Sequence, residues 1–80
     1  MNSTVNKSGI PLSYIGEGKR VQIIRIDGSD RLKSRLNAIG FVPKTEVFVV
    51  KNSTKGPLVI SIKGSKIAIG SGIAHKIIVA

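Results

Sequence analysis

The 80-residue sequence contains neither cysteine nor tryptophan, and its apolar runs are short. Without cysteine the chain can form no disulfide and no thiolate-ligated metal site. The longest apolar runs are four residues, at positions 47–50 and 77–80, whereas a membrane-spanning helix needs roughly 20. Residues 1–9 are mostly polar and offer no apolar segment for a signal peptide. We therefore expect a single small cytoplasmic domain that does not insert into the membrane.

Acidic residues are also scarce. Four Asp and Glu stand against 13 Lys and Arg, which gives a formal net charge of +9. Such an excess favours an acidic protein, a nucleic acid backbone or an anionic membrane surface as the partner. Because the basic residues are scattered rather than grouped in blocks, ordinary solvation of the surface explains them equally well. Charge alone therefore leaves the class of partner open.

Residues that could carry catalysis or bind a metal are few. His75 is the single histidine, and it has no acidic neighbour in the sequence to orient it. Among the four acidic residues, Asp27 and Asp30 are better explained as residues at the start of a helix than as a catalytic pair. The sequence lacks the G-x-x-x-x-G-K-[ST] motif that cradles a phosphate. We expect no enzymatic activity, no catalytic residues, no metal site and no cofactor.

The clearest local pattern predicts a helix at residues 30–39. Leu32, Leu36 and Ile39 recur at the spacing of one helix face, so we expect these three side chains to be buried together. Gly40 follows the last of them and can adopt the left-handed backbone conformation that ends a helix.

Both ends of this helix carry recognisable signals. Ser29 or Asp30 can cap the first N–H groups. Phe41 stands where an apolar residue packs back on the helix after a glycine stop, and Pro43 prevents the helix from resuming.

Five segments are predicted to be strands by their alternating or β-branched residues: residues 19–26, 45–50, 58–63, 66–69 and 76–80. In the first of them the apolar phase slips between Ile23 and Ile24, as a β-bulge or a sharp bend produces.

Residues 64–65 predict a two-residue hairpin turn with glycine in the first position. Pairing across this turn would set Lys63 opposite Lys66 and Ile62 opposite Ile67, with the isoleucines of both strands on one face.

These elements predict a mainly β protein, a small five-stranded SH3-like barrel with one short helix inserted between the first and second strands. Residues 1–10 are expected to form a flexible lead-in, and residues 11–80 a single domain. No internal repeat or second domain is visible in the sequence.

Six side chains are candidates for contact with a partner: Arg31, Lys33 and Arg35 on the helix, Phe48 on the second strand, and Lys63 and Lys66 at the hairpin. Phe48 falls on the face opposite Val47 and Val49, so it is either covered by the helix or the N-terminal turn, or it anchors a partner. A charged helix face is more often explained by simple solvation than by contact with a partner.

Nucleic acid binding is the main alternative from another class. Small barrels bind RNA through basic grooves and stacked aromatic rings. Here Tyr14 and Phe48 are the one potential stacking pair, since Phe41 is assigned to the helix stop.

The sequence resembles the FeoA family, small cytoplasmic proteins of bacterial ferrous iron uptake. The resemblance runs from Leu12 to Val79 and is carried by Leu12-Ser13 before Gly18, by Asp30, Leu32, Arg35 and Leu36, by Ile39-Gly40-Phe41-Val42-Pro43, by Gly56-Pro57, by Gly64, and by Ala74 before Ile77 and Val79. Three features depart from the family pattern. Lys44 stands where glycine usually follows the proline, Gly70 where a basic residue is common, and Lys55-Gly56-Pro57 lacks the usual acidic residue.

The resemblance implies an accessory or regulatory role rather than a reaction. FeoA-like proteins are thought to assist FeoB, a membrane permease with a cytosolic GTP-binding domain. It therefore implies contact with that domain, and a location in the cytoplasm or at the inner face of the membrane through the partner. We expect the six candidate side chains, chosen from the sequence pattern, to make this contact. The oligomeric state, and whether the effect is activation, inhibition or stabilisation, stay open.

Overall fold

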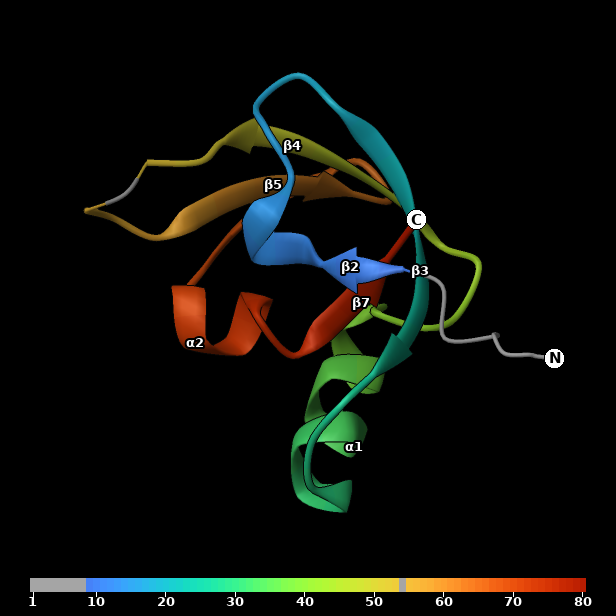
Figure 1. Cartoon of the computed structure of the whole chain (residues 1–80). Coiled ribbons are helices and arrows are strands. Elements are labelled where there is room, and N and C mark those ends of the chain that lie inside the picture. Colours follow the sequence, from blue (N-terminus) through green and yellow to red (C-terminus); the bar gives the residue numbers. More distant parts are fainter. Residues whose placement is uncertain (1–8, 54) are drawn as a thin grey trace, which may run out of the picture.

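The computed structural model describes residues 9–53 and 55–80. Its elements are β2 (Ile10–Pro11), the 3-10 turn η1 (Leu12–Tyr14), β3 (Arg20–Ile26), α1 (Asp30–Ile39), β4 (Glu46–Lys51), β5 (Leu58–Ile62), β6 (Ser65–Ile69), α2 (Ser71–Ala74) and β7 (Ile77–Val79). The strands form one antiparallel sheet in the order β2-β7-β3-β4-β5-β6, which curls round the core (Figure 1).

The predicted architecture is confirmed, with α1 inserted between the first two long strands, β3 and β4. The described sheet has six strands rather than five, because Ile10 and Pro11 pair with Val79 and Ile78 as a short additional strand. Ile10, assigned to the lead-in from the sequence, thus already belongs to the sheet. Residues 1–8 of that lead-in lie outside the described residues.

Helix α1 has the predicted bounds and the predicted ends. The Ser29 hydroxyl oxygen accepts a hydrogen bond from the Leu32 N–H at 3.1 Å, which identifies Ser29 as the cap. Gly40 has a φ of 118°, and the Phe41 N–H donates to the Leu36 carbonyl at 3.0 Å. This is the six-to-one bond of a Schellman ending, and it brings the buried Leu36 and Phe41 side chains into the same core.

Ile39 does not belong to the buried face of α1, although the sequence pattern predicts that it does. It is 53% exposed, whereas Leu36 is buried and Leu32 packs against the core. The prediction that all three side chains are buried together was therefore wrong for Ile39. The chain reverses immediately after this residue, and the fully buried Phe41 fills the core beneath the last helical turn in its place.

The phase slip in β3 is confirmed as an irregularity of the sheet. The register of β3 with β7 shifts between Ile23 and Arg25. Both Ile23 and Ile26 are buried although they lie three residues apart, which strict alternation in a strand would not allow. The slip therefore lets β3 contribute to the core along its whole length.

The β5–β6 hairpin forms, but its turn is residues 63–64 rather than 64–65. Both have positive φ, 50° and 83°, as a type I′ turn requires, and Ile62 faces Ser65 across it. The predicted pairing of Lys63 with Lys66, and the register built on it, was therefore wrong. The two registers differ by two residues, which keeps every side chain on its own face, so the apolar pattern could not distinguish them.

Candidate protein interface

A row of side chains crosses the outer face of the sheet. Arg20 of β3 lies opposite Phe48 of β4, Phe48 opposite Ser61 of β5, and Ser61 opposite Lys66 of β6. Directly opposed residues of antiparallel strands point to the same face, so these four side chains form one cross-strand row. Val47 and Val49, the neighbours of Phe48, are fully buried, which confirms that Phe48 points away from the core.

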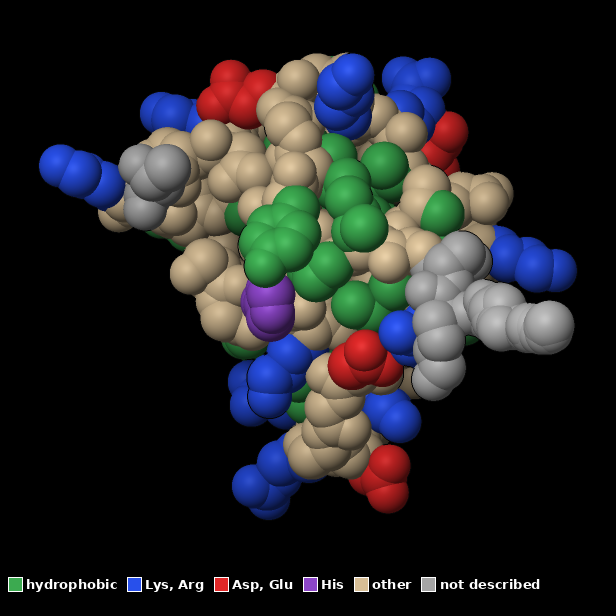
Figure 2. Space-filling model, in the orientation of Figure 1, with side chains coloured by type: hydrophobic (Ala, Val, Ile, Leu, Met, Phe, Trp, Pro, Cys, Tyr) green, Lys and Arg blue, Asp and Glu red, His purple; other side chains and the backbone are tan. Residues whose placement is uncertain are grey.

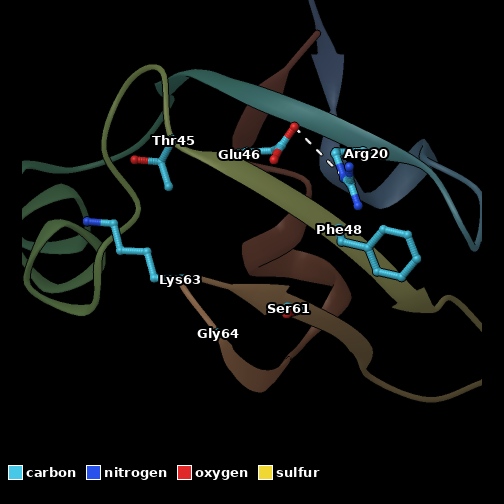
Figure 3. Close-up of a pocket in the computed structure, with 7 residues that line it drawn as sticks. All are labelled: Arg20, Thr45, Glu46, Phe48, Ser61, Lys63 and Gly64. Atoms are coloured by element: carbon cyan, nitrogen blue, oxygen red, sulfur yellow. Dashed lines mark ion pairs between the residues drawn. The ribbon is translucent and has the colours of Figure 1, made fainter.

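An open pocket of about 520 Å³ follows this row and extends toward the β5–β6 turn (Figure 3). It is lined by Arg20, Thr45, Glu46, Phe48, Ser61, Lys63 and Gly64. The Arg20 guanidinium carbon lies 5.8 Å from the centre of the Phe48 ring, and Arg20 Nε lies 3.8 Å from a Glu46 carboxylate oxygen. Both side chains of this ion pair are well exposed, so it is weak. The half-buried Phe48 thus has Arg20 over its ring.

We refer to Arg20, Phe48, Lys63 and Lys66 as the sheet patch. Three of its members are candidates from the sequence, and the register of the sheet brings them onto one face. Arg20 was not a candidate. The sequence places it at the start of a strand, and only the pairing of β3 with β4 sets it opposite Phe48.

The three basic residues of α1 do not share a face. Arg31 and Arg35 are four residues apart and so lie one above the other, together with the exposed Ile39 four residues further on. Lys33 is two residues from each arginine, which places it on the opposite flank of the helix. There it lines a second, smaller hollow with Arg25, Ile26, Asn37 and Pro43. We refer to Arg31, Arg35 and Ile39 as the helix row.

The end of α1 meets the sheet patch at Gly40. A Cβ atom placed on Gly40 would lie 3.7 Å from Cδ of Lys63, and Figure 3 shows the Lys63 side chain extending from the pocket rim toward the helix. The helix row ends one residue before Gly40. The sheet patch and the C-terminal end of the helix row are therefore neighbours on the surface.

His75 has a structural explanation. Its Nδ1 lies 3.2 Å from the Ser13 hydroxyl, and its ring meets the Tyr14 ring edge-on at a centroid distance of 5.5 Å. These contacts join the segment after α2 to η1. Figure 2 shows the histidine at the rim of a cluster of apolar side chains, and Tyr14 and Ile10 are both exposed on this part of the chain.

The two rings predicted to stack on a nucleic acid have different partners, since Tyr14 packs on His75 and Phe48 on Arg20. Among residues 9–53 and 55–80, no three His, Cys, Asp or Glu side chains gather as a group that could hold a metal ion. Within the same residues, no helix is long and apolar enough to cross a membrane.

Together, the fold and the exposed cations define a small SH3-like protein with a surface suited to binding another macromolecule. The family model for the FeoA domain matches residues 10–80. This match covers most of the chain, and the chain belongs to the FeoA family.

One curated relative and one solved structure support this assignment, and a second solved structure supports the fold. The "Putative Fe(2+) transport protein A" of Methanocaldococcus jannaschii is 41% identical over 69 residues, which cover 86% of this chain and 83% of the relative. A crystal structure of an iron uptake regulatory protein (FeoA) superimposes with a TM-score of 0.83 at 30% identity, covering 90% of this chain and 96% of the other. Stenotrophomonas maltophilia FeoA, crystallised with zinc and described as a prokaryotic SH3 domain protein, gives a TM-score of 0.79 at 21% identity and covers 89% of each chain, which supports the fold alone.

Proposed function

We propose that this protein is a non-enzymatic accessory protein of ferrous iron uptake that binds the cytosolic GTP-binding domain of a FeoB-type permease. The observation that carries the proposal is the pair of adjacent basic surfaces, each with an exposed or half-exposed apolar side chain: Ile39 in the helix row and Phe48 in the sheet patch. Membership of a ferrous iron transport family supports the process, and the charge of +9 supports an acidic surface on the partner.

The helix row suits docking by its geometry. Both arginines are exposed, four residues apart, and project from a helix that its cap and its Schellman ending hold in place. Interfaces combine apolar anchors, which supply affinity, with charges, which supply orientation and rate. Ile39 supplies the first and the arginines the second. The protein would then act in the cytoplasm, at the inner face of the membrane, through its partner.

Charge reversal tests the proposal. Replacing Arg31 and Arg35 together by Glu should weaken binding to the permease domain by at least tenfold, because like charges would meet across the contact. The helix should still form, since neither side chain is buried. Circular dichroism and thermal unfolding check the fold, and isothermal titration or biolayer interferometry measures the binding.

Lys33→Glu, compared with Arg35→Glu, is the matched control. Both changes remove one exposed positive charge from α1 and add one negative charge, but on opposite flanks. Weakening by Arg35→Glu alone places the contact on the helix row. Equal weakening by both would mean that overall charge, rather than this row, determines binding. Lack of binding by the wild-type protein would overturn the proposed function.

Nucleic acid binding, the alternative from the sequence, is supported by charge alone and not by the family match. It predicts a salt-dependent shift of labelled RNA or DNA.

A further inference from the structure

β6 ends the sheet. It pairs with β5 on one side, and no strand among residues 9–53 and 55–80 pairs with it on the other. The residues that close a two-residue turn exchange hydrogen bonds, so Ser65, Ile67 and Ile69 direct their backbone groups toward β5. Alternation then turns the N–H and C=O groups of Lys66 and Ala68 to the free side. Both residues are exposed, so the edge is open to pairing.

The sheet patch borders this edge. The Lys66 side chain lies in the row with Phe48 and Arg20, and Lys63 stands at the adjacent turn. Of the described residues that line the pocket, Glu46 is the single acidic one, and it is paired with Arg20. The outer face beside β6 therefore carries a surplus of positive charge next to a half-buried aromatic ring. This charge is complementary to an acidic segment.

The other face of β6 has the opposite character. Ile69 is buried, and Ile67 is only partly buried against the core, so its side chain still offers apolar surface at the edge. A strand added here would direct alternate side chains to the two faces. One set would meet Lys66 and the sheet patch, and the other would meet Ile67. The edge therefore selects for a segment in which acidic and apolar residues alternate.

We propose that an extended segment of the partner protein, with alternating acidic and apolar residues, adds to β6 as a further strand and places its carboxylates on the sheet patch. This inference rests on the proposed function and names the chemistry of the contact. In such strand addition the main-chain hydrogen bonds supply affinity and the alternate side chains supply specificity. The arrangement also uses Lys63 and Lys66, which the helix row does not reach.

A lysine on an edge strand has another use, because it prevents unwanted pairing with other chains. The two roles predict opposite effects of Lys66→Ala. If Lys66 attracts an acidic segment, its removal weakens binding of the partner. If it only blocks pairing, its removal strengthens association or causes the protein to aggregate.

Amide hydrogen exchange of the full, ¹⁵N-labelled protein tests the inference. With the permease's cytosolic domain in excess, the amides of Lys66 and Ala68 should exchange at least tenfold more slowly than in the free protein. The amide of the exposed Gly72 in α2, outside the sheet, should not change. Lys66→Glu should weaken binding at least tenfold, whereas Lys51→Glu, an equal charge change at an exposed position of β4, should not.

The outcomes separate this inference from the proposed function. Binding by wild type without slower exchange at Lys66 and Ala68, or binding that Lys66→Glu and Lys66→Ala leave unchanged, overturns strand addition and leaves the proposed function standing. No binding by wild type overturns both. Slower exchange at both edge amides together with loss of binding by Lys66→Glu establishes the added strand.

Discussion

The Arg20 guanidinium lies over the Phe48 ring, 5.8 Å from its centre, and the two residues face each other across β3 and β4. An exposed contact of this kind stabilises a protein by about 0.5–1 kcal/mol. The pair therefore contributes little to the stability of the fold. Because it lies in the sheet patch, we expect it to contribute mainly to binding of a partner.

Replacing Arg20 by Met separates these roles, because methionine keeps most of the aliphatic stem and removes the charge. We expect the free energy of unfolding to change by no more than about 1 kcal/mol, since the ion pair and the cation–π contact are both exposed. Binding to the permease domain should fall severalfold. Denaturant unfolding and titration measure the two quantities. A loss of stability well above this limit would show that the pair is structural, and unchanged binding would remove Arg20 from the interface.

Gly40→Val should destabilise the protein by about 1–2 kcal/mol, because a β-branched residue is forced to a φ of 118°. Steric conflict at the Cβ is not the cause, since the nearest atoms to a Cβ at this position belong to the Lys63 side chain and lie at ordinary contact distances, 3.7 Å and beyond. Thermal unfolding measures the change. Gly16→Val is a useful comparison, as Gly16 has no positive φ and open space around it, and it should cost much less. Equal costs at the two positions would argue against strain at the helix stop.

Lys44→Gly should stabilise the protein by about 0.5–1 kcal/mol. Lys44 has a φ of 75° and is the third residue of a type II turn, after Val42 and Pro43. The Thr45 N–H closes this turn by donating a hydrogen bond to the Val42 carbonyl at 3.2 Å. Glycine relieves the strain of the left-handed conformation at this position. It also raises the entropy of the unfolded chain, which cancels part of the gain in stability. Lys44→Ala removes the same charge but keeps the Cβ, and it should not stabilise. If both variants gained equally, charge rather than backbone strain would be responsible.

Anaerobic titration of the isolated protein with ferrous iron should reveal no stoichiometric site of submicromolar affinity. Tight sites need several converging nitrogen, sulfur or carboxylate ligands. The sequence supplies one histidine and four acidic residues, and His75 is occupied with Ser13 and Tyr14. A tight site that His75→Ala abolishes would contradict this expectation.

Much of the fold could be predicted from local sequence signals. The cap at Ser29, the stop at Gly40 and the phase slip in β3 each depend on a few adjacent residues, and each is observed. The glycine that the FeoA resemblance leads one to expect at position 44 agrees with the positive φ found there.

The rest depends on contacts between distant residues. The hairpin register could not be read, because two registers bury the same face and the lysine at position 63 adopts a positive φ. Asn52 lies between two of the predicted strands, and its side-chain amide donates to the carbonyls of Ser13 and Ile15, at 3.1 and 2.7 Å. No local pattern indicates such a link. Arg20 could not be predicted as a neighbour of Phe48 for the same reason, because only the pairing of β3 with β4 sets the two residues opposite each other.

The proposed docking is tested most directly by the rate of association between this protein and the cytosolic domain of a FeoB-type permease at two salt concentrations. If basic surfaces guide the encounter, added salt should lower the association rate constant by a larger factor than it raises the dissociation rate constant. Stopped-flow fluorescence or biolayer interferometry gives both constants. We expect measurable binding with this asymmetry. Absence of binding at low salt, or an association rate that salt does not change, would contradict it.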